Sequence, residues 1–563
     1  MKTLPPMVIS AFLIWIAPLK VHGFVPSIVS NKCTMDHVPL RIPSRKQDGV
    51  TGRNAHLGIH ATITQSEAEV EAIPIGSITI VLPSDKNAVS KYGSKSPVEN
   101  PSYVDAAVHL ANKLGWFSDG TLKVNVMHAN EILGNDQLVI KADALIAMGL
   151  STKEDLKSIK SVFEERRHSN NLKQCQFALD CAEKLPSIVG PYDEVEPSLA
   201  STILPWTQDA TGCRMHEQMM ELFDRWTTDD FAVALLVFFD QFIAEIPWVK
   251  HSIDATWEKG PIRNAQELYS MVSKCGNCIR KCLNDDDCKK CIKALNAVDT
   301  RDQVASYRTI VSYESELLKD FSYCILSKNN IFGCSADIPR LPKVVPISSW
   351  RGEPLTTETA QGLLVGHLDD NAAPEGSLRS DISWKVAAGA NVAYDQFPSQ
   401  NQIFYPSSNG RDMWYDPVFR VETIDGRNVW CKRHYKVRNG PIPGTFHFSV
   451  LDNGVTSKEF WSIVGVADDL SWIVFHYAGA AAAVGQRYLG GLVCTPDGAL
   501  PPNTLEIWDA LKSAGIQPWE LFCVDNDVNS PGALAAGPPP LTFFRKDVQE
   551  VKLTKQREEV KIV

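Results

Sequence analysis

Residues 457–496 constrain the fold of this chain more than any other segment. They read SKEFWSIVGVADDLSWIVFHYAGAAAAVGQRYLGGLVCTP and contain three strand-like runs. Because side chains alternate between the two faces of a strand, Glu459, Trp461 and Ile463 share one face of the first run. The matching faces of the other two runs hold Ile473, Phe475 and Tyr477, and then Tyr488, Gly490, Leu492 and Cys494. The short ADDL turn joins the first two runs as a hairpin, so the segment predicts an antiparallel meander.

Length and charge limit the classes of protein that fit. A chain of 563 residues is too long for one core, and domains of about 150 residues predict two to four units. The net charge of −10 argues against a nucleic-acid partner and gives no attraction to an anionic membrane at neutral pH. The stretch 231–248 is interrupted by Asp240 and Glu245, so its uninterrupted apolar run falls well short of the ~18 residues a membrane span needs. It predicts a buried helix.

The first 70 residues have the pattern of a targeting segment. Residues 1–23 combine Lys2, an apolar run and Gly23, which predicts a signal peptide. Residues 24–70 begin with Phe24 and are basic up to about residue 60, which predicts a transit peptide. A signal peptide followed by Phe and a basic segment resembles the presequences of algae with secondary plastids. We therefore expect a plastid protein, in the stroma or the thylakoid lumen; the alternative is an ordinary secreted protein.

The rest of the chain predicts an α+β multidomain protein. Residues 71–165 alternate strand and helix patterns and indicate a small α/β unit, in which 128–136 is expected to be a loop. Residues 166–336 have helical patterns and many cysteines, and 337–378 have the Pro and Gly content of a linker. Residues 379–526 predict a β-barrel with a helix at 505–516 packed outside it, followed by a tail at 527–563.

Ten of the 14 cysteines fall between residues 166 and 336. They are Cys175, Cys181, Cys213, Cys275, Cys278, Cys282, Cys288, Cys291, Cys324 and Cys334. A zinc ribbon would use two Cys-x2-Cys pairs, but only nine residues separate Cys278 from Cys288, and Cys282 would be left over. Because the chain begins with a secretory signal, disulfides are the favoured interpretation, and no bound metal is expected. The sequence does not define the pairing.

Several of these segments together resemble the violaxanthin de-epoxidase family. The resemblance lies in FHYAG and YLGGLVCT of the meander, in SWKVAAGANVAYDQF (383–397) and in the Cys-rich segment 275–334. It covers roughly the second half of the chain and is strongest to the violaxanthin de-epoxidase-related branch of algae with secondary plastids. It implies an eight-stranded lipocalin-like barrel, a xanthophyll or other carotenoid as ligand, and ascorbate as reductant. The short tail lacks the long Glu-rich character of the de-epoxidase itself, so docking on the thylakoid membrane surface is left open.

The expected reaction requires a general acid, because the oxygen of a carotenoid epoxide must be protonated as it leaves. Glu459 is the first candidate, since a carboxyl held among apolar side chains keeps its proton to higher pH. Tyr477 matches a family tyrosine and is predicted to hold the ring or relay a proton. Trp461, Phe475, Tyr488 and Asp395 are predicted to contact the substrate, with Asp395 as a structural or pH-responsive group.

Departures from the family pattern leave catalysis open. Glu459 stands where the family has Asp, Cys494 where active enzymes have Tyr, and Pro398 and Ser399 where they have Asp and Cys. A shift of ~1 Å in a catalytic group can cost about a hundredfold in rate. Three hypotheses follow: a carotenoid oxidoreductase or isomerase, a catalytically silent xanthophyll carrier, and a lipocalin of the secretory path with another ligand. Glu459 as a solvated strand carboxylate and Tyr477 as an ordinary core residue are the plain alternatives.

Overall fold

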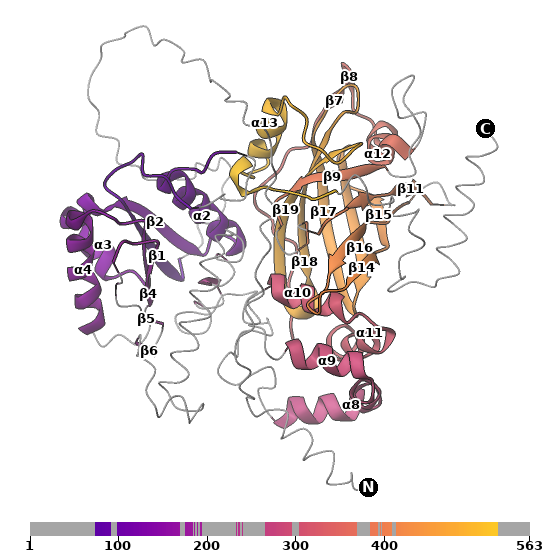
Figure 1. Ribbon diagram of the computed structural model, residues 1–563, viewed down its shortest axis with the longest axis horizontal. Coiled ribbons are helices and arrows are strands. Elements are labelled where there is room, and N and C mark those ends of the chain that lie inside the picture. The colour runs from indigo at the N-terminus through magenta and orange to yellow at the C-terminus, as the bar shows by residue number, and fades with distance from the viewer. Residues whose placement is uncertain are drawn as a thin grey trace.

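The computed structural model describes two sheets and a group of helices (Figure 1). The described residues are 74–91, 98–168, 175–183, 185, 188–189, 192–193, 232, 235–236, 239, 265–295, 303–368, 383–391, 394–395, 397–407 and 412–526. The predicted signal peptide, transit segment and tail lie outside these residues, as do Cys33 and Cys213. Among the described helices, none has the length and apolar character to cross a membrane.

The N-terminal unit is a doubly wound parallel sheet. Strands β1 (Gly76–Leu82), β2 (Leu122–His128), β3 (Ala144–Met148) and β4 (Cys175–Leu179) are parallel and lie in the order β2-β1-β3-β4. Two short antiparallel strands, β5 (Ile188–Val189) and β6 (Tyr192–Asp193), extend the sheet. Helix α2 (Tyr103–Phe117) shares a core with one face, and α3 (Ile132–Ile140) and α4 (Lys153–His168) share a core with the other.

This unit differs from the sequence prediction in two places. Its sheet continues past residue 165, because β4 pairs with β3 and brings Cys175 into the core. The predicted loop at 128–136 is the short helix η1 (Ala129–Glu131) followed by α3. The apolar stretch 231–248 was expected to be a buried helix. Its four described residues, Ala232, Leu235, Leu236 and Phe239, are helical and buried against the α2 face of the sheet.

The second sheet is antiparallel and strongly curled, and it has twelve strands in the described part of the chain. They are β9 (Trp384–Gly389), β10 (Asn401–Gln402), β11 (Phe404–Pro406), β12 (Met413–Tyr415), β13 (Val418–Glu422), β14 (Asn428–Lys432), β15 (Tyr435–Asn439), β16 (Thr445–Asp452), β17 (Val455–Val466), β18 (Ile473–Ala481), β19 (Gln486–Thr495) and β20 (Phe522–Cys523). The predicted meander forms β17, β18 and β19, and the predicted faces of these strands lie in one aromatic core. That core fills the interior of the curled sheet.

One end of the interior is covered by the segment predicted to be a linker. Residues 349–354 form the hairpin β7 (Ser349–Trp350) and β8 (Glu353–Pro354), and α12 (Thr357–Val365) buries Leu363 and Leu364 in the interior core. Trp384 is fully buried and donates from Nε1 to the Leu363 carbonyl at 3.1 Å. The linker prediction was wrong because a stretch without apolar periodicity can still form a cap over an exposed core.

The predicted outer helix is α13 (Leu505–Ser513). Its Ile507 and Leu511 pack with Trp472, Val474 and Val493 in a separate core on the outside of the curled sheet. Alternation explains this arrangement, because Val474 and Val493 point away from the interior that their strand neighbours fill.

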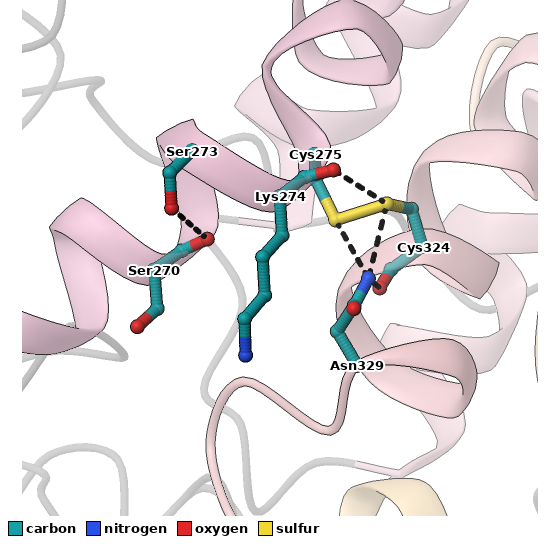
Figure 2. The surroundings of a disulfide bond; sticks show 6 residues. All are labelled: Ser270, Ser273, Lys274, Cys275, Cys324 and Asn329. Atoms are coloured by element: carbon teal, nitrogen blue, oxygen red, sulfur yellow. Dashed lines mark hydrogen bonds between the residues drawn. A yellow bond between two sulfur atoms is a disulfide. The ribbon is translucent and has the colours of Figure 1, made fainter.

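Helices α8 (Ala265–Asn284), α9 (Asp286–Leu295), α10 (Gln303–Ser312) and α11 (Glu316–Ser322), with η4 (Tyr323–Lys328), lie at the opposite end of the curled sheet from α12 (Figure 1). They contain two disulfides, Cys275–Cys324 and Cys282–Cys288. Asn329 holds the first by donating to the Cys324 carbonyl at 2.8 Å (Figure 2). This pairing separates the two Cys-x2-Cys motifs, so they do not form the zinc ribbon considered as an alternative.

The remaining cysteine predictions are corrected or untested. Cys175 and Cys181 belong to the α/β unit and are free thiols, as are Cys278 and Cys291 in the helical region. Burial raises the pKa of Cys181 to about 11 and that of Cys291 to about 12, so these thiols are protonated at neutral pH. Cys334 is buried, and Cys213 lies outside the described residues.

We expect the Cys275–Cys324 disulfide to contribute more stability than Cys282–Cys288. The sequence separations are 49 and 6 residues, and loop-closure entropy then predicts roughly 4 and 2 kcal/mol. The double variant Cys275→Ala/Cys324→Ala should make α8–α11 protease-sensitive while residues 383–526 stay resistant. Limited proteolysis against Cys282→Ala/Cys288→Ala measures this, and equal resistance of both variants would contradict it.

The α/β unit packs against the outside of the curled sheet through polar contacts that are partly buried. His109 of α2 contacts Glu520 at 2.7 Å, and Arg487 of β19 contacts Asp119 at 2.7 Å. His109 and Glu520 are almost wholly buried, and Trp519 joins the core beneath α2. The N-terminal unit therefore covers part of the outer surface of the curled sheet. None of its described residues belongs to the interior core.

Candidate functional site

Glu459 lies inside the curled sheet, at the end nearer the helices. Strand alternation places it on the same face as Trp461, whose indole Nε1 donates to Glu459 Oε2 at 2.6 Å. Tyr488, from β19, donates its hydroxyl to the other carboxyl oxygen at 2.8 Å. Glu459 is 7 % exposed, which excludes the plain interpretation that it is a solvated strand carboxylate.

A second carboxyl lies in the same interior. Asp395 follows β9, and both of its oxygens are 2.9 Å from the hydroxyl of Tyr477 on β18. The Asn391 backbone N–H also donates to Asp395 Oδ2 at 2.8 Å. Tyr477 therefore has a hydrogen-bonded hydroxyl, and it links two segments 82 residues apart.

The two carboxyl groups are joined by aromatic rings. Tyr477 stacks on Trp461 with ring centroids 5.2 Å apart and meets Tyr488 edge-on at 6.3 Å. The ring centroid of Phe475 lies 5.6 Å from that of Trp461. All six residues predicted to form the site are thus in one cluster: Glu459, Tyr477, Trp461, Phe475, Tyr488 and Asp395. Their roles in binding or catalysis remain predictions.

Glycines make room for the tyrosine rings. A Cβ at Gly490 would overlap the ring of Tyr477, and a Cβ at Gly479 would overlap the ring of Tyr488. Each glycine is the cross-strand partner of the tyrosine it accommodates. The space beside Gly490 is what sets the position of the Tyr477 hydroxyl.

Burial dominates the electrostatics of the site. It raises the pKa of Asp395 to about 8, although the hydrogen bonds from Asn391 and Tyr477 lower it. Burial likewise raises the pKa of Glu459, against the hydrogen bonds from Trp461 and Tyr488. Both carboxyls therefore retain protons to higher pH than in water, which is the property required of a general acid.

Cys494 lies near the end of β19 and is buried in the same core. Burial raises its pKa well above the usual thiol value, with Asp395 raising it further. A protonated thiol is a weak hydrogen-bond donor, so Cys494 does not replace the hydroxyl of the tyrosine expected from the family pattern.

Sequence reasoning missed a buried charge network at the helical end of the interior. Arg433, between β14 and β15, is fully buried and contacts Glu314 at 3.0 Å and Asp452 at 2.8 Å. Tyr307 of α10 donates to Asp452 at 3.0 Å. The network connects the helical region, through Tyr307 and Glu314, to the end of the sheet nearest Glu459. The only sequence signal for this network is an arginine among strand residues. The partners of Arg433 could not be predicted because they come from distant segments of the chain.

We expect Gly490→Ala to disturb the site selectively. The added methyl must displace Tyr477, which is held between Trp461 and Asp395, and overpacking of this kind costs ~1–3 kcal/mol. The melting temperature should fall, and tyrosine near-UV circular dichroism should change. Gly362→Ala in α12 is the control, because its Cβ meets nothing within 4 Å and alanine favours a helix. Equal melting temperatures for the two variants would contradict the expectation.

The described residues contain no group of three or more His, Cys, Asp or Glu side chains placed to hold a metal ion. The site residues in the described part of the chain supply two carboxyls, two phenols and an indole.

The curled antiparallel sheet with an outer helix belongs to the lipocalin class of folds. More specifically, residues 267–526 match the family model of the VDE lipocalin domain. The match covers less than half of the chain, contains Glu459, Tyr477 and Asp395, and supports the predicted relation to the violaxanthin de-epoxidase family.

Solved structures give weaker likenesses, and no curated protein matches the chain. Lobster apocrustacyanin A1 is 13 % identical, with 33 % of this chain and 93 % of that chain covered and a TM-score of 0.21. H1 crustacyanin from the lobster Homarus americanus is 14 % identical, with 35 % and 98 % covered and a TM-score of 0.21. The siderocalin Ex-FABP is 9 % identical, with 25 % and 91 % covered and a TM-score of 0.20. With TM-scores this low, no functional argument rests on these likenesses.

Proposed function

We propose that the chain is a xanthophyll-epoxide oxidoreductase or isomerase of the violaxanthin de-epoxidase-related type. The observation that carries this proposal is a buried, proton-retaining carboxyl, Glu459, held by two donors in an aromatic interior. The match of residues 267–526 to the VDE lipocalin domain supports the same conclusion.

In the proposed reaction Glu459 donates its proton to the epoxide oxygen as a ring carbon–oxygen bond breaks. Ascorbate then supplies two electrons, the second carbon–oxygen bond breaks, and a proton from solvent releases the oxygen as water. The proton that ascorbate loses restores the acid form of Glu459. Ascorbate becomes dehydroascorbate, and the ring keeps a carbon–carbon double bond. Tyr477 and Asp395 hold the ring or return a proton to Glu459, while Trp461, Phe475 and Tyr488 contact the apolar substrate.

We further propose that the curled sheet acts as a closed barrel of eight strands. The short strands β10 and β11, β12 and β13, and β14 and β15 follow one another with only one or two residues between them. Taken as three bent strands, they continue the pairing from β9 round to β16, and β19 pairs back to β9. A barrel of this size holds an elongated apolar ligand once the stacked rings of Trp461 and Phe448 part to admit it.

A second function, a catalytically silent xanthophyll carrier, is favoured by one observation. Both oxygens of Glu459 already accept hydrogen bonds from the protein, and the buried Cys494 contributes no strong donor. A carboxyl so occupied can serve as a polar anchor without transferring a proton.

The two functions are separated by a direct assay. The purified, oxidised protein is incubated with violaxanthin or diadinoxanthin and ascorbate between about pH 5 and 7.5, where a raised carboxyl pKa titrates. Chromatography of the pigments then shows turnover or its absence. Tight binding without de-epoxidised product would support the carrier function. Absence of both binding and product would refute both functions and favour a lipocalin with another ligand.

We propose a plastid location, in the stroma or the thylakoid lumen. The support is the predicted signal peptide followed by Phe24 and a basic segment. A fusion of residues 1–60 to a fluorescent protein should enter a complex plastid, and Phe24→Ala should hold it outside. Import of the variant would show that Phe24 is incidental. Contact with the thylakoid membrane surface belongs to the same proposal.

A further inference from the structure

Tyr394 has a buried hydroxyl for which the described residues provide no hydrogen-bond partner. Its ring is partly accessible, whereas the hydroxyl oxygen is shielded from solvent. A buried hydroxyl without a partner lowers stability, and natural proteins seldom keep one unless another group occupies the position.

Five other tyrosines around the curled sheet differ from Tyr394 in this respect. Their hydroxyls are hydrogen-bonded as follows: Tyr307 to Asp452, Tyr405 to Asp416, Tyr415 to Gln402, Tyr477 to Asp395 and Tyr488 to Glu459. The unpartnered hydroxyl is thus a property of this position and not of tyrosines in this fold.

The ring of Tyr394 is firmly placed. It packs edge-on against Phe419 at 5.2 Å and tilted against Tyr307 at 5.7 Å. Its backbone N–H bonds the Asn391 carbonyl at 3.2 Å, in the same turn that holds Asp395. The turn and the ring contacts therefore fix the direction of the hydroxyl.

The hydroxyl lies in the electrostatic field of the candidate site. Burial raises the pKa of Tyr394, Arg433 lowers it, and the carboxyls of Asp452, Glu459 and Asp395 raise it. Tyr394 in turn raises the pKa of Tyr488, after burial and Glu459. Tyr394 therefore keeps its proton at neutral pH and can donate a hydrogen bond.

We propose that Tyr394 is a ligand-contacting residue of this site, and that its hydroxyl donates to an oxygen atom of a bound xanthophyll. Glu459 and Asp395 are already bonded to protein donors, so the Tyr394 hydroxyl is the polar group that gains most from an oxygen-bearing ligand. The inference rests on the proposed function and adds to it a specificity: oxygenated carotenoids are favoured over hydrocarbon ones.

The test compares violaxanthin, which carries oxygen, with β-carotene, which carries none. Dissociation constants from quenching of tryptophan fluorescence are measured for the full chain and for Tyr394→Phe. One lost hydrogen bond should weaken violaxanthin binding about five- to tenfold and leave β-carotene binding unchanged. Tyr405→Phe is the matched control, because its hydroxyl bonds Asp416 and the ring belongs to a separate cluster with Ile403 and Val418.

The outcomes separate this inference from the proposed function. Unchanged violaxanthin affinity in Tyr394→Phe means that water fills the position, and an equal loss for both pigments means that the residue only supports packing; either result overturns the inference. If Glu459→Gln still abolishes turnover in these cases, the proposed function stands. Failure of the unaltered chain to bind either pigment overturns both.

Discussion

Replacing Glu459 with Gln should lower the turnover of an epoxy-xanthophyll about 10²–10⁴-fold and change pigment binding by no more than a few fold. The amide has the shape of the protonated acid but carries no transferable proton, and this range is what a general acid contributes. The amide oxygen can accept from the Trp461 indole N–H and the amide NH2 can donate to the Tyr488 hydroxyl oxygen, so the interior should not rearrange. Steady-state kinetics and pigment titration measure the two effects separately.

Two further variants define the result. Tyr477→Phe removes a supporting donor and should lower turnover by roughly 10². Glu422→Gln, at an exposed position on β13, should change nothing. If the unaltered chain binds pigment without turnover and Glu459→Gln is silent, the barrel is a carrier.

The same argument fixes the direction of the pH dependence. The working form of Glu459 is protonated, so turnover should fall as pH rises through its raised pKa. Asp395 has a folded-state pKa of about 8, above the ~3.9 of an unfolded aspartate. The folded state therefore binds the proton more tightly, and the free energy of unfolding should decrease as pH rises from about 4 through 8. Both activity and stability should be greater in mild acid.

Strand alternation predicted the interior of the sheet because it depends only on nearest neighbours in the chain. It placed Glu459 and Trp461 on one face, and their hydrogen bond joins residues two apart. The bond between Tyr477 and Asp395 was not predictable in the same way, since 82 residues separate the two and only the pairing of β19 with both β18 and β9 brings them together. The resemblance, not the pattern, drew attention to Asp395.

The mispredicted regions share a different cause. The segment 337–378 has no regular apolar period, yet α12 buries four apolar side chains because the open end of the sheet offers them a core. Cys175 was assigned to a disulfide domain by its neighbours in the sequence, whereas parallel pairing with β3 decides its position. In both cases tertiary contacts outweigh local composition.

The Arg433 network is the largest electrostatic feature that the sequence did not reveal. Burial raises the pKa of Glu314 to about 7, because desolvation exceeds the attraction of Arg433. Asn453 and Cys431 also contact Glu314, at 2.8 and 3.8 Å. One guanidinium thus serves two carboxyls, Glu314 and Asp452, whose side chains are only 10 % and 14 % exposed.

Replacing Arg433 with Met should therefore lower the free energy of unfolding by about 3 kcal/mol at neutral pH, near the lower end of what removing one partner of a buried ion pair costs. Glu314 has a folded-state pKa of about 7, and its protonation relieves part of the loss, so the difference between variant and unaltered protein should shrink as pH falls from neutral to about 5. Arg438→Met is the control, since Arg438 is 66 % exposed and lies 3.9 Å from Asp412; it should change stability by less than ~1 kcal/mol. Urea unfolding at both pH values measures the effect. A loss in Arg433→Met no greater than in Arg438→Met would mean that the apolar contacts of α10, and not the charges, hold the helices over the site.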